Sequence, residues 1–293
     1  MPNDKRIAVL AASAMITALI WISVLATDRS VLKVTFLDVG DGLCTVVRTP
    51  SGKTMVFDCG TSSWRDNESI GTRLAAPYLQ SMGIDKIDVA VLSHPHSDHV
   101  SGFAGLLAAK PAKLVLDTGI KEGSPEYMKF IRAIRKCHAR YRIAKRGQVL
   151  DMGDGVKVKV LDPTMIASNS DLNEECIVLR IVYGQSAFLL AADAGDEAEH
   201  EMLSDGIKVR AQLLQVGHHG SRLATSPEWI EAVKPDIAVI SCARNSQYHF
   251  PSRQVVERLE ASGARVYITG KDGAIQATTD GNTIWMRTFR NSW

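Results

Sequence analysis

The stretch His94-Pro95-His96-Ser97-Asp98-His99 places four potential metal ligands within six residues. It follows the apolar run 87–92 (Ile-Asp-Val-Ala-Val-Leu), which is typical of a buried strand that leads into a loop. In an extended backbone alternate side chains point the same way, so His94, His96 and Asp98 would share one side. His99 would complete the cluster if the chain turns. Imidazole and carboxylate together suit zinc, manganese or iron, and a polar surface loop has little reason to concentrate them.

The composition is that of a large folded domain. The chain has 293 residues, of which 45% are hydrophobic, and a formal net charge of +2. The whole molecule is therefore not a polycation, and any case for nucleic-acid binding has to come from local patches. The five cysteines are scattered singly without CxxC spacing, which argues against a disulfide framework or a structural zinc site.

The first thirty residues differ from the rest. Residues 7–26 carry no charge, Lys5 and Arg6 precede them, and the length is sufficient to cross a bilayer as a helix. The basic flank would stay in the cytoplasm. We predict a membrane anchor or signal segment over 1–30 and one domain over 31–293. That domain would lie outside the inner or cytoplasmic membrane, or be exported. A cleaved signal peptide and a helix buried in the core are the alternatives.

Short strands and interspersed helices follow residue 30, without an internal repeat or a linker. This arrangement favours a layered α/β domain over a regular βαβ repeat. Ser124 is the expected N-cap of one helix, with Pro125 at its first position. The predicted helices are 70–82, 102–109, 124–138, 196–203, 227–233 and 252–261. The predicted strands are 31–39, 43–48, 53–59, 87–92, 113–117, 156–161, 175–183, 186–191, 211–216, 237–241, 265–269, 273–279 and 283–287.

Two further polar signals end apolar strands downstream. Asp193 follows the run 188–192, and the doublet His218-His219 follows the run 213–216. Alone, each is weak, because an Asp after a strand is usually a turn residue and a His pair is usually at the surface. With one histidine of the doublet counted, they and the first cluster supply six ligands, the number that two metals sharing a carboxylate and a water require. Asp193 is the natural bridging carboxylate.

Asp58 ends the strand 53–59 and has two interpretations. It can orient a histidine ligand by accepting a hydrogen bond from the second ring nitrogen. It can equally be a turn residue before Gly60.

These motifs resemble the metallo-β-lactamase fold superfamily and, more narrowly, the hydrolase domain of ComEC competence proteins and its stand-alone relatives. The resemblance covers roughly residues 31 to 285 and rests on the segments 36–40 (FLDVG), 57–60 (FDCG), 94–99 (HPHSDH), 216–221 (VGHHGS) and 272–275 (DGAI). It implies a four-layer αββα sandwich with sheets inside, helices outside and two divalent metal ions, Zn²⁺ or Mn²⁺, at one edge.

Carried over by position, the resemblance assigns His94 and His96 to one metal and Asp98 and His99 to the other, with Asp193 bridging. His218 or His219 would complete the second site. We prefer His218 as the ligand, with His219 near the substrate. The implied catalytic residues are Asp98 and His219, and the implied activity is hydrolysis by a metal-bridged hydroxide.

This chain departs from the family pattern in three places. The region 169–176 lacks the third histidine that many members supply to the first metal, although Asn173 could sit by the site. Ala192 stands where the family usually has Gly. The channel-forming membrane domain of full ComEC proteins is absent, so a complete DNA-uptake activity is not implied.

The substrate is less constrained than the chemistry, because fold does not choose among esters. Residues 127–150 contain eight Lys or Arg and no acid. These cations could follow a phosphate backbone, form a solvated helix face, or lie near anionic lipid headgroups. In the loop 244–250, bases could stack on Tyr248 or Phe250, or these rings could simply pack. We expect a phosphodiesterase or nuclease acting on DNA. The alternatives are a hydrolase of small esters, lactones or phosphorylcholine esters, and a non-catalytic nucleic-acid-binding relative. The sequence does not indicate an oligomeric state.

Overall fold

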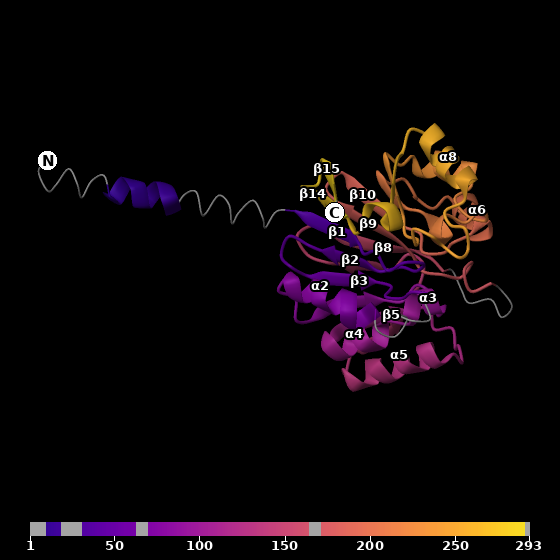
Figure 1. The fold of residues 1–293 in the computed structure, drawn as a ribbon, viewed down its shortest axis with the longest axis horizontal. Coiled ribbons are helices and arrows are strands. Elements are labelled where there is room, and N and C mark those ends of the chain that lie inside the picture. The colour runs from indigo at the N-terminus through magenta and orange to yellow at the C-terminus, as the bar shows by residue number, and fades with distance from the viewer. Residues whose placement is uncertain (1–9, 19–30, 63–69, 164–170, 291–293) are drawn as a thin grey trace, which may run out of the picture.

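In the computed structural model of this chain, the structure describes residues 10–18, 31–62, 70–163 and 171–290. From residue 31 onward these residues form two mixed β-sheets that pack face to face, with helices on the two outer faces (Figure 1). The four-layer αββα sandwich predicted from the sequence is therefore confirmed.

The first sheet has the strand order β15-β14-β1-β2-β3-β4-β5-β6. Strands β3 to β6 run parallel to one another, and the other neighbours are antiparallel. The strands are β1 (Leu32–Phe36), β2 (Thr45–Arg48), β3 (Thr54–Phe57), β4 (Ile87–Val91), β5 (Ala112–Asp117), β6 (Arg140–Ile143), β14 (Ile275–Thr279) and β15 (Ile284–Thr288).

The second sheet has the order β13-β12-β11-β10-β9-β8-β7. Strands β10 to β13 run parallel to one another, so each sheet contains a block of four parallel strands. The strands are β7 (Val149–Asp151), β8 (Lys157–Asp162), β9 (Val178–Tyr183), β10 (Ser186–Leu190), β11 (Leu213–Gln215), β12 (Ile237–Ile240) and β13 (Arg265–Ile268).

The helices separate into two outer layers. The first sheet is covered by α2 (Ala76–Ser81), α4 (Phe103–Ala109) and α5 (Pro125–Lys136), which Figure 1 shows together on its outer side. The second is covered by α6 (Asp196–Ser204), α7 (Pro227–Val233) and α8 (Arg253–Ala261). Short turns of helix lie at strand ends: α3 (Ser97–Val100), the 3₁₀ turn η2 (Gly217–Gly220) and α9 (Thr269–Asp272).

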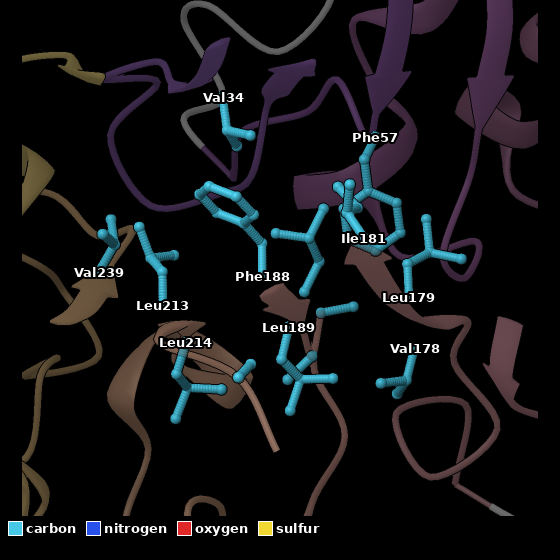
Figure 2. Close-up of a cluster of buried hydrophobic side chains, with 14 of the residues drawn as sticks. Val34, Phe57, Val178, Leu179, Ile181, Phe188, Leu189, Leu213, Leu214 and Val239 are labelled. Carbon is cyan, nitrogen blue, oxygen red and sulfur yellow. The ribbon is translucent and has the colours of Figure 1, made fainter. Parts of the chain in front are cut away.

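Alternation along the strands divides the core into two clusters. In β4, Val89 and Val91 face the second sheet, whereas Ala90 faces the helices of the first. Figure 2 shows the contact between the sheets, where Val34 lies opposite Phe188 on β10 and Phe57 lies beside Ile181 on β9. Because both faces of the inner parallel strands β4 and β12 are almost entirely buried, their sequences are nearly continuous apolar runs.

Most predicted elements are present within a few residues of their expected ends. The side chain of Ser124 accepts a hydrogen bond from the Tyr127 backbone N–H at 3.3 Å, as the N-cap prediction required. The predicted helix over 70–82 begins with a π-helical turn at Gly71–Ala75 before α2. Strands β6 and β7 were not predicted, and all four residues of β6 are exposed.

Only residues 10–18 of the predicted membrane segment 7–26 are among the described residues, and they are helical. The rest of the segment lies outside the described residues. Among the helices that the structure describes, none combines the length and the apolar character needed to cross a bilayer. The anchor over 1–30 stays a prediction.

Phe188 offers a test of the packing between the sheets, because its side chain is fully buried there. We expect Phe188→Ala to lower the free energy of unfolding by about 3–5 kcal/mol, the usual cost of removing a buried ring. Val149→Ala on the edge strand β7, where the side chain is 53% exposed, is the control. Urea denaturation followed by circular dichroism measures both, and equal losses for the two variants would contradict this assignment of the core.

Candidate metal centre

The polar residues singled out in the sequence follow the carboxyl ends of parallel strands. Asp58 follows β3 and His94 follows β4 in the first sheet, while Asp193 follows β10 and the His218-His219 doublet follows β11 in the second. The two sheets present these ends at one edge of the sandwich, where the side chains from both halves come within 4.0 Å of one another.

Four of these side chains form a compact group: Asp98, His99, Asp193 and His219. One ligand atom from each lies within 4.8 Å of all the others. The Nε2 atom of His99 lies 3.1 Å from Oδ1 of Asp193, and Nε2 of His219 lies 3.5 Å from the same oxygen. Nε2 of His219 is also 3.3 Å from Oδ2 of Asp98. Two acids and two imidazoles from three separate places in the chain therefore point at one position.

This group fits a divalent cation. Within the described residues, His99 Nε2, His219 Nε2 and Asp193 Oδ1 are buried and have no hydrogen-bond partner. Buried polar atoms without partners are costly, and three of them facing one point indicate a missing common partner. Ligand atoms about 2.0–2.1 Å from a tetrahedral zinc are separated from one another by about 3.3 Å, which agrees with the three separations given above, whereas His99 Nε2 and Asp98 Oδ2 are 3.9 Å apart.

A second pair of imidazoles lies beside this group. His94 Nε2 is 2.9 Å from His96 Nδ1, so the two nitrogens converge on one position. His94 Nε2 is also 4.0 Å from Oδ2 of Asp193, the oxygen that the four-residue group does not use. Asp193 is therefore placed between two positions, as a bridging carboxylate would be.

We preferred His218 as the ligand from the sequence, but the structure places the other histidine of the doublet among the convergent donors. His219, not His218, belongs to the four-residue group. His218 Nε2 lies 4.0 Å from Oδ2 of Asp193, on the side of His94. Both residues have left-handed backbone conformations, with φ of 48° and 55°. These conformations set the direction of each side chain, and residue order alone does not reveal them.

Asp58 holds the first histidine cluster in place. Its carboxylate is fully buried and accepts hydrogen bonds from His99 Nδ1 at 2.8 Å, from the Ser93 hydroxyl at 2.6 Å and from the Ser93 N–H at 2.7 Å. With Nδ1 of His99 donating, its Nε2 is left as the free ligand atom. Of the two interpretations of Asp58, the structure supports the one in which it orients a histidine.

Two further residues position the second-sheet ligands, and the sequence analysis did not select either. His219 Nδ1 donates to the backbone oxygen of Ser241 at 2.8 Å, which fixes the ring with Nε2 toward the group. The buried side chain of Gln215 accepts from the Ala192 N–H at 2.8 Å and donates to the Val216 oxygen at 2.6 Å. A polar residue in the apolar run 213–216 was the available signal.

Close backbone approach surrounds the 96–99 turn. A Cβ atom on Gly60 would lie 2.4 Å from the His99 nitrogen, so a side chain there would displace the turn. The Leu43 N–H donates to the Asp98 oxygen at 3.0 Å, and the Cys59 N–H donates to the His99 oxygen at 2.9 Å. The predicted turn that brings His99 into the cluster is the start of α3.

Other sequence departures acquire a structural setting. Ala192 has φ of 48°, a conformation that favours glycine, which explains the family preference at this position. Asn173 lies in a turn that precedes β9. Just after this turn, the Ile177 backbone N–H donates a hydrogen bond to the backbone oxygen of Ser93. The Asn173 Oδ1 atom is buried and lacks a partner within the described residues.

The electrostatics favour a cation. Burial lowers the pKa of His94 well below its ordinary value, so that ring stays neutral. Burial would raise the pKa of Asp193, but the imidazoles of His99 and His219 hold it well below its ordinary value. For His99, burial is outweighed by the carboxylates of Asp193 and Asp58, which raise its pKa. Ionised acids that hold protons on neighbouring imidazoles attract a divalent cation, which would release those protons.

The two histidines of the doublet can be separated experimentally. A ligand that binds only the folded state raises its stability, by about 2.7 kcal/mol at a hundred times its Kd. We expect Zn²⁺ to raise the Tm of the wild type, and His219→Ala to lose most of that rise. His218→Ala, the matched neighbour, should retain the larger part. Differential scanning calorimetry with and without Zn²⁺ measures this, and the reverse ranking would show that the placement of the doublet is incorrect.

Asp58 can be tested through metal affinity. Asp58→Asn keeps the shape but weakens the acceptor for His99 Nδ1–H, and such orienting partners are worth about 10- to 100-fold in affinity. We expect a fall of that size in Mn²⁺ or Zn²⁺ affinity by titration calorimetry. Asp88→Asn, a carboxylate at the first part of β4, is the control that should leave affinity unchanged.

Comparisons with known proteins agree with this geometry. Residues 37–244 match the family model of the metallo-β-lactamase superfamily. Recombination protein 2 of Haemophilus influenzae is 32% identical over 94% of this chain, and ComE operon protein 3 of Bacillus subtilis is 31% identical over 83%. Each alignment covers 32% of the relative, so the chain spans about a third of the length of these proteins.

Solved structures show the same fold at low identity. The metallo-β-lactamase fold protein YhfI from Bacillus subtilis has a TM-score of 0.53 at 13% identity, covering 87% of this chain and 100% of that one. Igni18, a metallo hydrolase from Ignicoccus hospitalis, has a TM-score of 0.51 at 13% identity, covering 89% and 100%. With its strand order, its His and Asp donors and the family match over most of its length, this chain belongs to the metallo-β-lactamase superfamily.

Proposed function

We propose that this protein is a metal-dependent phosphodiesterase that cleaves DNA. The observation that carries the proposal is the group Asp98, His99, Asp193 and His219, whose buried ligand atoms converge without partners from the described residues. The chain belongs to the metallo-β-lactamase superfamily, and its imidazole and carboxylate donors suit a hydrolytic metal centre.

The residues divide into those that would hold cations and those that would meet substrate. One position has Asp98, His99, Asp193 and His219, and a second has His94 and His96 with the other oxygen of Asp193. A bound divalent cation lowers the pKa of a coordinated water from about 15.7 to about 7. In the four-residue group Asp98 is the most exposed, at 22% of its side chain. Asp98 is therefore the member of this group that substrate or water would meet first.

A phosphodiester substrate is favoured by the basic segment 127–150. Arg146 does not contribute, because it is taken up by ion pairs with Asp162, Glu201 and Asp205. The exposed cations of the segment are Arg132, Arg135, Lys136, Arg140, Arg142 and Lys145. Strand β6 runs parallel to β5, so its carboxyl end lies toward the edge that holds the metal ligands, with Arg142 near that end of the strand and Lys145 just beyond it. Cations there can bind phosphates that flank the cleaved one.

DNA is favoured over other diesters by the names of the relatives. The similar proteins include Recombination protein 2, ComE operon protein 3 and Competence protein ComA of Neisseria gonorrhoeae. These relatives are about three times as long as the aligned part, so their complete activities are not transferred. We also propose that the enzyme acts outside the cytoplasmic membrane, and the predicted segment over 7–26 supports this location.

The test is cleavage of linear DNA by the full-length chain with Mn²⁺ or Zn²⁺. We expect metal-dependent cleavage that Asp98→Ala reduces by more than about 100-fold, since even residues that only orient ligands are worth 10- to 100-fold. Asp236→Ala, an exposed acid just before β12 at the opposite edge of the second sheet, is the matched control.

Three outcomes contradict the proposal in different ways. Hydrolysis of bis(p-nitrophenyl) phosphate without cleavage of DNA would indicate a hydrolase of small esters. Tight metal binding and salt-sensitive DNA binding without turnover would indicate a binding protein. Cleavage that is equally reduced in the two variants would separate activity from the four-residue group.

A further inference from the structure

An aromatic column leads from the metal centre to the surface. The Phe250 ring is stacked on the His219 ring, with centroids 6.1 Å apart and planes inclined by 28°. The Tyr248 ring is stacked on Phe250 at 5.6 Å and 29°. Both separations lie in the range of offset aromatic stacking. The stack therefore extends outward from the imidazole of a proposed metal ligand, and its two aromatic residues lie in the segment between β12 and α8.

The outer ring of this column is open to solvent. Tyr248 is 51% exposed, although it is a large aromatic side chain. Its inner face meets Phe250, so the exposed part includes the face that continues the stack. Exposed aromatic side chains are ordinary, but this one ends a stack that begins at a proposed metal ligand, and an aromatic face there is a surface on which a planar group can be placed.

The segment that carries the column is fixed to the metal-binding turn. The Ser252 N–H donates to the oxygen of Gly220 at 2.8 Å. A Cβ atom on Gly220 would lie only 2.6 Å from the Cβ of Pro251, so the two segments are in direct contact. At its other end, the Ala243 N–H donates to Asp41 Oδ1 at 3.0 Å. The column is therefore organised before any ligand arrives, which lowers the entropic cost of binding.

The chemistry of the segment suits a nucleotide. Residues 243–251 contain no acid, and Arg244, Asn245, Gln247 and His249 are exposed. A cation and amides beside an aromatic face are the groups that bind the phosphate and the base of a single strand. A base inside a duplex has both faces covered by its neighbours, so only an unstacked base can use such a face.

We propose that the exposed face of Tyr248 is a stacking subsite for a nucleobase of single-stranded DNA, next to the phosphodiester at the metal centre. This inference rests on the proposed function and specifies its substrate as a single strand or a frayed end. Tyr248 acts as a positioning residue, because it holds the base and does not touch the reacting phosphate.

The test measures the binding of Tyr248 variants to two oligonucleotides, one that carries the probed base and one that lacks it. The probe is a short single-stranded oligonucleotide with phosphorothioate linkages that resist cleavage and one 2-aminopurine, whose fluorescence falls on stacking. We expect Tyr248→Leu in the full-length chain to raise its Kd by about 5- to 150-fold, the range of one base–aromatic stack, and to abolish the quenching. Tyr248→Phe should bind and quench like the wild type.

An abasic oligonucleotide gives the second arm of the test. The wild type should bind it more weakly, and Tyr248→Leu should add no further loss. Trp285→Leu on β15, equally exposed at 51%, is the matched control and should change neither Kd. In cleavage of unmodified single strands, Tyr248→Leu should raise KM more than it lowers kcat, with metal content and Tm unchanged.

The outcomes distinguish the two proposals. If the wild type cleaves DNA but Tyr248→Leu keeps its affinity and quenching, the stacking subsite is overturned and the nuclease stands. Equal losses for the base-containing and abasic strands would also overturn it, because the ring would then act on something other than the base. If the wild type cleaves no DNA, the proposed function fails, and the quenching measurement alone decides whether Tyr248 stacks a base.

Discussion

The centre of this structure depends on one buried carboxylate. Asp58 receives hydrogen bonds from His99 and from both polar groups of Ser93, and so joins the end of β3 to the loop that follows β4. Burial raises the pKa of Asp58, and these donors oppose that effect. A buried carboxylate is tolerable only when it is hydrogen-bonded. The dependence is mutual: His99 stabilises the acid, and the acid turns the ring so that its other nitrogen faces the ligand group.

The sequence contained the layers and the donors, but not the directions of the side chains. Apolar runs bounded by Gly and polar residues located the strands near the ligands, and the Ser124 cap located the start of α5. Strand β6 was missed because Arg140–Ile143 is an exposed edge strand, whose charged residues carry no burial signal. The choice between His218 and His219 depended on two left-handed residues that only the folded backbone reveals. Likewise, Arg146 was counted among the free cations of its segment, because the sequence does not show that folding brings Asp162 and Glu201 within ion-pair distance of it.

Backbone strain accompanies the ligands. Asp58, Ala192, His218 and His219 all have positive φ without being glycine, and all lie at the ends of strands that carry the site. Such conformations cost of order 1–3 kcal/mol each and persist where neighbouring contacts hold them. Here the His218 N–H donates to the Ala192 oxygen and the Asp58 N–H donates to the Val91 oxygen, both at 2.9 Å. The directions of the donors are thus imposed by the main chain of the two sheets.

The donors of the four-residue group come from both halves of the sandwich, with Asp98 and His99 from one and Asp193 and His219 from the other. All five cysteines are free thiols. An ion held by this group would consequently be the long-range cross-link that the thiols do not provide, closing a loop between Asp98 and Asp193. Clips that close long loops remove much of the freedom of the unfolded chain. One bound ion would then serve both the hydrolytic centre and the stability of the fold. A cell short of the metal would therefore lose the stabilisation together with the activity.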